Sequence, residues 1–219
     1  MRIIKKIAQL FIQPVIRKRI HRTSIYTWKD ITLHLPPGIF HPAYFFSTKF
    51  LLQHLMKKDV SGRSFLELGA GNGLISISAA QRGALVSSSD ISVKVIELLK
   101  ENARSNKVEL KVIHSDLFDN IDPQQFSIIA INPPYYPKTP RNEFEQAWYC
   151  GENFEYFEKL FLQLPKYHDV KSEVLMVLSE ECDLSRIKNI AATNNYDLIL
   201  KEKKRIYWEM NYIFEIRRA

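Results

Sequence analysis

The chain has 219 residues, 46% hydrophobic and 12% aromatic, so it is the size of one α/β domain with a short extension and too apolar to be disordered. Its two cysteines, Cys150 and Cys182, are far apart in sequence and lack metal-ligand spacing, so we expect no disulfide framework and no bound metal. Two cysteines without a disulfide framework favour reduced thiols and a cytoplasmic protein. No apolar run approaches the ~20 residues of a membrane span, so we do not expect an integral membrane protein.

The net charge of +7 is concentrated near the N-terminus. Residues 1–22 contain seven Lys or Arg residues and no Asp or Glu, and the other 24 basic residues balance all 24 acidic ones. The body of the chain is therefore close to neutral, and attraction to a polyanion belongs mainly to this first segment.

Residues 1–22 are predicted to form a basic amphipathic arm. Pro14 should end or kink the helix. The apolar side chains that share one helical face are Ile3, Ile4, Ile7, Ala8 and Phe11. We expect this helix to pack on the core with its basic face in solvent. Contact with RNA or a partner, and a membrane-surface helix, are the alternatives that the sequence leaves open.

Residues 23–60 are predicted to be a lead-in segment, and residues 61–219 the main domain. The lead-in reads as a hairpin over 24–35 and a helix over 48–58. The predicted strands of the main domain are 64–68, 85–89, 109–114, 126–131, 173–179, 198–204 and 211–217. The predicted helices between them are 74–82, 93–106, 154–164 and 184–194. This alternation predicts a doubly wound, seven-stranded, mostly parallel α/β sheet that binds ligands at the carboxyl ends of its strands.

A glycine-rich loop joins the first predicted strand of the main domain to the helix that follows. It reads Glu67-Leu68-Gly69-Ala70-Gly71-Asn72-Gly73, and we call it the glycine loop. Without side chains at its glycines, a ligand can lie against the backbone, and several positions can adopt positive φ. The loop is therefore predicted to bind a ligand, although a tight turn alone would explain the glycines.

Two acidic residues follow the next two predicted strands. Asp90 comes 23 residues after Glu67, close to the ~20-residue separation expected for an acid that binds ribose hydroxyls. Asp116 ends the third strand, where it is suited to an adenine amino group. Helix capping by Asp90 and turn capping by Asp116 are the structural alternatives.

The motif Asn132-Pro133-Pro134-Tyr135, residues 132–135, follows the apolar strand 126–131. Two prolines stop the strand at a rigid turn that presents an amide oxygen, fixed carbonyls and an aromatic face. These groups suit a planar, weakly nucleophilic nitrogen that must be held, desolvated and methylated. Asn132 Oδ1 and the Pro133 carbonyl can accept its two N–H bonds, and Tyr135 can stack on it.

A nicotinamide dinucleotide site is the nearest competing interpretation, but the glycine loop lacks G-x-G-x-x-G spacing. The chain instead resembles class I S-adenosylmethionine-dependent methyltransferases with a Rossmann-like fold. The resemblance implies a cofactor site, with ribose bound by Asp90 and adenine met by Asp116 and Leu117. Its full set is Glu67, Gly69, Ala70, Gly71, Gly73, Asp90, Ile91, Asp116, Leu117 and Asn132. The implied catalytic residues are Asn132, Pro133, Pro134 and Tyr135.

The motif and its flanks also resemble two methyltransferase groups with different substrates. Residues 147–153 look like the segment after the same motif in HemK-like glutamine N5-methyltransferases, which modify the Gly-Gly-Gln loop of release factors. Residues 38–40 and 47–52 look like the lead-in of small-domain ribosomal and transfer-RNA methyltransferases, which adds Phe40 and Thr48 as pocket residues. A protein glutamine is therefore favoured over an adenine or guanine amine in RNA or DNA. A scaffold that binds the cofactor without catalysis is the alternative of another class.

Overall fold

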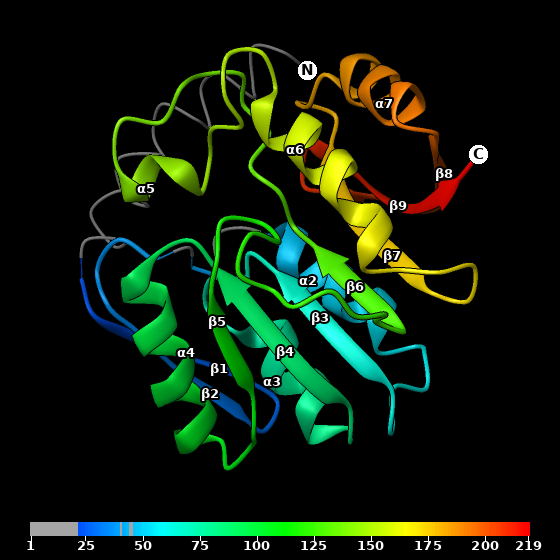
Figure 1. Cartoon of the computed structure of the whole chain (residues 1–219). Helices are drawn as coiled ribbons and strands as arrows, with labels where there is room; N and C mark the ends of the chain where they lie inside the picture. Colours follow the sequence, from blue (N-terminus) through cyan, green and yellow to red (C-terminus); the bar gives the residue numbers. More distant parts are fainter. Residues whose placement is uncertain (1–21, 40, 44–45) are drawn as a thin grey trace.

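The computed structural model describes residues 22–39, 41–43 and 46–219, except for the side chain of Phe144. The predicted arm, apart from Arg22, and Phe40 lie outside the described residues. Within them, the chain forms a seven-stranded sheet with helices on both faces and a two-stranded hairpin beside it (Figure 1). The predicted fold class is confirmed.

The main sheet has the strand order β5-β4-β3-β6-β7-β9-β8. The strands from β5 to β7 run parallel, and β9 is antiparallel to both β7 and β8. Their bounds are β3 Ser64–Leu68, β4 Leu85–Asp90, β5 Lys111–His114, β6 Ile128–Ile131, β7 Glu173–Ser179, β8 Tyr196–Ile206 and β9 Glu209–Arg218. The parallel strands therefore end together at one edge, where doubly wound sheets bind ligands.

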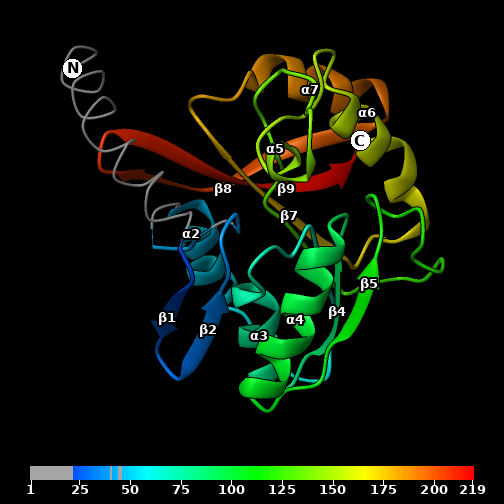
Figure 2. The same ribbon diagram turned by 90° about the vertical axis from the view of Figure 1, so that its left-hand side faces the viewer.

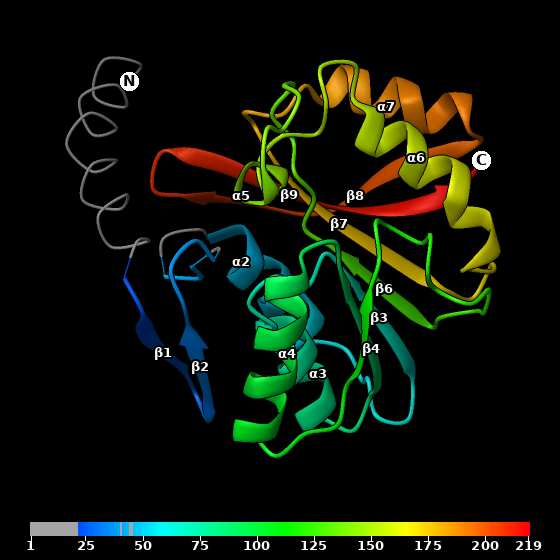
Figure 3. The ribbon, with the colours of Figure 1, turned by 60° about the vertical axis from the view of Figure 1, so that its left-hand side comes forward.

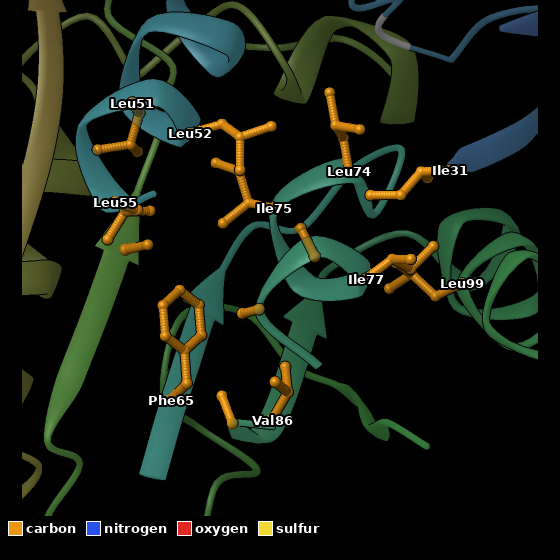
Figure 4. Close-up of a cluster of buried hydrophobic side chains, with 14 of the residues drawn as sticks. Ile31, Leu51, Leu52, Leu55, Phe65, Leu74, Ile75, Ile77, Val86 and Leu99 are labelled. Carbon is orange, nitrogen blue, oxygen red and sulfur yellow. The ribbon is translucent and has the colours of Figure 1, made fainter. Parts of the chain in front are cut away.

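Side chains of the central strands alternate between two buried clusters, one on each face of the sheet. In β3, Phe65 belongs to the first cluster and Leu66 to the second. The first cluster lies beneath α2 (Phe46–Leu55), α3 (Leu74–Gln81), α4 (Val93–Ser105) and the hairpin of β1 (Ser24–Trp28) and β2 (Ile31–Leu35). Figure 4 shows Leu52 of α2 beside Ile75 of α3 in this cluster.

The second cluster lies beneath α6 (Glu155–Gln163), the short 3₁₀ helix η1 (Leu164–Lys166) and α7 (Leu184–Thr193). It is rich in aromatic rings, and Phe118 stacks on Tyr167 with their ring centroids 4.2 Å apart. Figure 3 shows α6 and α7 on one side of the sheet and α2, α3 and α4 on the other. Covering both faces buries all of β6 and most of β3 and β7, which explains their largely apolar sequences.

Two asparagines of α4 attach the β1–β2 hairpin to the main domain. Asn106 accepts a bond from Thr32 N at 2.9 Å and donates to Thr32 O at 2.7 Å. Asn102 makes the equivalent pair with His34, at 2.9 and 3.3 Å. Side-chain amides thus take the place of a neighbouring strand at the edge of β2, and they fix the lead-in beside the carboxyl edge of the sheet.

Most element boundaries follow the prediction, and the differences have local causes. β6 begins at Ile128 rather than 126, because the two preceding amides do not bond to the backbone of a neighbouring strand. Phe126 N donates to Tyr167 O, and Ser127 N donates to the side-chain oxygen of Ser64. A short helix, α5 (Glu143–Gln146), is not predicted; Asn142 caps it through its side chain. β8 and β9 are longer than predicted, which leaves Tyr207 and Trp208 as the only connecting residues.

Candidate active site

A cavity of about 970 Å³ opens at the carboxyl ends of β3, β4 and β6. Its wall includes the glycine loop, the ends of β4 and β6, and the first turn of α2. The predicted site residues on this wall are Thr48, Glu67, Gly69, Ala70, Gly71, Asp90, Ile91, Asp116, Leu117, Asn132, Pro133, Pro134 and Tyr135. Five separate segments of sequence therefore meet at one site.

The glycines of the loop have two different roles. Gly69 and Gly71 have φ of 73° and 52°, and a Cβ at either position would meet nothing within 4 Å, so a ligand can lie against this backbone. Gly73 does not line the cavity. A Cβ there would lie 2.7 Å from Leu99 Cδ2 of α4. Gly73 therefore has a packing role, because this glycine lets α4 approach the loop, and its predicted cofactor contact stays a prediction.

Asp90 connects the glycine loop to the start of α4 through its two carboxylate oxygens. Oδ2 accepts a bond from Gly71 N at 3.0 Å, and Oδ1 accepts one from Ser92 N at 3.0 Å. Burial raises the pKa of Asp90, and the bonds from Ser92 and Gly71 oppose that rise. Each oxygen keeps a further lone pair for a hydroxyl donor. The N-cap of α4 is Ser92, whose side chain accepts from Val95 N, so Asp90 does not cap this helix and keeps acceptor sites for a ligand.

Asp116 is held at the cavity wall by a lysine that the sequence analysis missed. Lys159 Nζ of α6 lies 2.6 Å from Asp116 Oδ2 and 2.6 Å from Asp119 Oδ2. Gln163, one turn further along α6, donates to Asp119 Oδ1 at 2.6 Å. The only sequence signal was the spacing of Lys159 and Gln163 on one face of a predicted helix. Lys159 also lines the cavity.

Glu67 turns its carboxylate toward α3. Its Oε2 accepts bonds from Ser76 N at 2.7 Å and from Ser76 Oγ, and Ser88 Oγ donates to Ser76 Oγ at 2.7 Å. Burial raises the pKa of Glu67 to about 8, which favours the protonated carboxyl at neutral pH. In the described structure, this side chain therefore joins the glycine loop to α3 and β4.

Asn132 and Thr48 form the contact that fixes the motif. Asn132 Nδ2 donates to Thr48 Oγ1 at 3.0 Å, and Thr48 is buried in the first turn of α2. Because the amide nitrogen is occupied by this bond, Oδ1 is the Asn132 atom that remains to accept a bond from a ligand. The predicted pocket residue Thr48 thus orients the predicted catalytic Asn132.

The segment from Trp148 to Cys150 supports the aromatic end of the motif. Tyr135 N and Tyr136 N both donate to Trp148 O, at 3.2 and 3.0 Å. Tyr136 Oη donates to Glu181 Oε2 at 2.8 Å, and the two tyrosine rings lie 4.8 Å apart. Burial raises the pKa of Tyr135 and keeps its hydroxyl protonated. The ring therefore offers an uncharged surface to a bound group.

Carboxylates outnumber cationic groups on the cavity wall. Apart from Glu67, whose carboxyl is protonated at neutral pH, the acidic residues are Asp90, Asp116, Glu143, Glu155 and Glu209, and the basic ones are Lys94 and Lys159. Lys94 donates to Pro37 O, and Lys159 is paired with Asp116. Such a wall favours cationic or neutral groups and disfavours phosphates. Sequence reasoning had not placed Glu143, Glu155 or Glu209 here, because each lies on a segment outside the recognised motifs.

Within the described ranges, no cluster of three or more His, Cys, Asp or Glu side chains is arranged to hold a metal ion. Nor does any helix in those ranges have the length and apolar character needed to cross a bilayer. Cys150 and Cys182 are free and buried, and burial raises the pKa of their thiols to about 11 and about 12. Neither thiol is a reactive nucleophile at neutral pH.

The sheet with its reversed β9, the glycine loop after β3 and the acids that follow β4 and β5 define a class I S-adenosylmethionine-dependent methyltransferase. The cavity fits this cofactor: Gly69 and Gly71 leave space, Asp90 and Asp116 supply acceptors, and the acidic wall suits a sulfonium. The chain belongs to the methyltransferase small domain family, which matches residues 30–147.

Curated relatives include enzymes with different names. The chain is 35% identical over 145 residues to a putative protein N5-glutamine methyltransferase of Methanocaldococcus jannaschii, covering 64% of this chain and 71% of that protein. It is 32% identical over 130 residues to the release factor glutamine methyltransferase of Lactococcus lactis, covering 55% of this chain and 47% of that protein. It is 30% identical over 115 residues to ribosomal RNA small subunit methyltransferase C of Buchnera aphidicola, covering 52% of this chain and 33% of that protein. The match thus spans less than half of these last two proteins.

Solved structures share the fold. The E. cuniculi Mtq2–Trm112 complex, responsible for methylation of the eRF1 translation termination factor, matches with a TM-score of 0.64 and 16% identity, over 83% of this chain and 99% of that one. The T. thermophilus 16S rRNA N2 G1207 methyltransferase, in complex with AdoMet and guanosine, matches with a TM-score of 0.62 and 18% identity. This match covers 90% of this chain and 50% of that one.

Proposed function

We propose that this methyltransferase modifies the side-chain amide of a glutamine in a protein, with a release-factor-like Gly-Gly-Gln loop as the substrate class. The observation that carries the proposal is the bond from Asn132 Nδ2 to Thr48 Oγ1, which leaves Oδ1 to accept from an amide N–H. The M. jannaschii and L. lactis relatives, both named as glutamine methyltransferases, support the same substrate. Such a substrate would be met in the cytoplasm.

The residues of the motif would act by positioning the substrate amide. Asn132 Oδ1 and the Pro133 carbonyl accept its two N–H bonds, and the Tyr135 ring covers its planar face. S-adenosylmethionine, when bound, supplies an electrophilic methyl group on a sulfonium. The amide nitrogen held by Asn132 and Pro133 would take this methyl group, the thioether would be the leaving group, and the nitrogen would release one proton to water. Orientation of this kind can contribute ~7–11 kcal/mol, so a strong base is not needed.

The charge of the cavity separates the glutamine proposal from methylation of a nucleobase. A nucleotide that reaches Asn132 brings its phosphates toward the wall that carries Glu143, Glu155 and Glu209. The repulsion opposes its approach, whereas a glutamine amide carries no charge. The ribosomal RNA relative keeps the nucleobase amine as the second candidate.

The proposal is tested by methyl transfer from labelled cofactor to a Gly-Gly-Gln peptide, to the full-length release factor of the source organism and to ribosomal RNA. We expect label in both protein substrates and on glutamine after hydrolysis. Asn132→Ala should lower turnover roughly 100-fold while cofactor affinity stays within about twofold. Thr48→Val should lower turnover less, and Thr48→Ser should restore it. Label in RNA alone would overturn the glutamine assignment, and cofactor binding without transfer would favour a scaffold.

A further inference from the structure

The β8–β9 hairpin extends beyond the rest of the main sheet. β7 pairs with β9 only as far as Asn211, whereas β8 and β9 remain paired to Ile206 and Glu209. Figure 2 shows the hairpin passing the end of β7 and reaching over α2. Its tip is the two-residue turn Tyr207-Trp208, in which Tyr207 has φ 54°. A non-glycine residue in this conformation is uncommon and carries a conformational cost.

The two faces of β8 near this tip differ. On the face toward α2, Glu202 bonds to His54 and Lys57, and Lys204 bonds to Gln53. Lys203 and Arg205 alternate with these residues and point to the opposite face, where both are exposed. Among the described residues, the Lys203 side chain has no hydrogen bond or ion pair, and the Arg205 side chain donates to Trp208 O at 3.5 Å. The outer face of the hairpin therefore presents two cationic side chains to solvent.

Exposed aromatic rings occupy the tip of the hairpin, between this basic face and the mouth of the cavity. Tyr207 is 70% exposed and Trp208 is 38% exposed. The Tyr207 ring lies 5.0 Å from that of Phe46, a residue of the cavity wall, and Ile206 and Glu209 on either side of the turn line the same cavity. Exposed aromatics with arginine are typical of the centre of a protein interface.

We propose that Lys203, Arg205, Tyr207 and Trp208, here called the hairpin surface, dock an acidic region of the protein whose glutamine enters the cavity. This inference rests on the proposed function. A glutamine side chain is small, neutral and common, so selection of one protein needs contacts outside the cavity. The cationic hairpin surface complements an acidic protein surface, and the carboxylates of the cavity wall oppose a nucleic acid that would cover both.

The test compares the full-length release factor of the source organism with a short Gly-Gly-Gln peptide as methyl acceptors. Lys203→Glu with Arg205→Glu should raise KM for the factor about tenfold, because attraction becomes repulsion, and should leave kcat unchanged. Tyr207→Ser should raise the same KM without changing its salt dependence. Neither variant should alter peptide kinetics, which also verifies the fold. Lys107→Glu with Lys166→Glu, two exposed lysines away from the cavity, is the matched charge control.

Each outcome decides between the proposals. A KM for the factor that rises in the hairpin variant, but not in the control, supports docking. Equal KM values for the factor in all variants overturn the proposed docking role of the hairpin surface and leave the proposed glutamine function intact. If wild-type protein methylates RNA and neither protein substrate, the glutamine function fails; loss of RNA binding in the hairpin variant would then assign the surface to nucleic acid. Transfer to no acceptor overturns both proposals.

Discussion

Single side chains at the cavity are held by bonds that come from other elements. Asn132 is oriented by Thr48 of α2, and Asp116 by Lys159 of α6. Neither partner is close in sequence to the residue it holds, so substitution of a partner should change the site through the residue that it orients. This dependence can be measured at Asp116 and at Glu67.

Lys159→Met should weaken cofactor binding about three- to fivefold, because Asp116 loses the cation that fixes Oδ2. Isothermal titration with S-adenosylhomocysteine measures the effect. S-inosylhomocysteine lacks the adenine amino group, so the variant should affect its binding less. An equal loss for both ligands would contradict a role through Asp116. Lys166→Met, an exposed lysine on η1, is the control.

The buried carboxyl of Glu67 should make stability depend on pH. Its folded pKa is raised to about 8 from 4.5, so it favours folding fully at low pH, and that contribution is lost as the pH rises from 4.5 through 8. Glu67→Gln keeps an acceptor for Ser76 but does not titrate. Urea unfolding should show the variant gaining stability relative to wild type between pH 5 and pH 8. A constant difference between the two proteins would contradict the raised pKa.

At the scale of elements, Gly73 allows α4 to pack closely against the glycine loop. Gly73→Ala should destabilise the fold by about 1–3 kcal/mol, because its φ is 81° and its Cβ would lie 2.7 Å from Leu99 Cδ2. Gly62→Ala is the matched control, since its φ is 68° but no atom lies within 4 Å. Denaturant unfolding of both variants separates backbone strain from the clash, and equal losses would show that the Leu99 contact costs nothing.

The elements themselves were largely predictable. The strand at Ser64–Leu68 and the helix beginning at Leu74 follow directly from apolar runs and the glycine loop between them. The extent of β8 was not, because Lys201, Lys203 and Arg205 give it no apolar pattern. Pairing with the buried strand β9 extends it, and that pairing is a tertiary effect that local propensity does not report.

At the scale of the whole molecule, the net charge of +7 lies on the predicted arm, and the rest of the chain is neutral. Deleting residues 1–22 removes seven basic residues and leaves a body without net charge. Binding to a single-stranded RNA oligonucleotide should therefore weaken, and its dependence on salt should become shallower. Filter binding between 50 and 200 mM salt, roughly the range over which phosphate contacts are lost, measures both. Unchanged affinity and slope would assign RNA contact to the body instead.

The sequence by itself determined the fold class and the motifs that meet at the cavity wall. The glycine loop, Asp90, Asp116 and Asn132 each follow a recognisable strand, and parallel strands bring their carboxyl ends to one edge. Only the tertiary structure decided that Thr48 orients Asn132, that Lys159 holds Asp116, that Gly73 serves packing and that Glu209 joins the wall. The physical reason is that a motif depends on residues within one segment and can be recognised there. These contacts join residues of distant segments, and no local sequence pattern indicates which segments will meet.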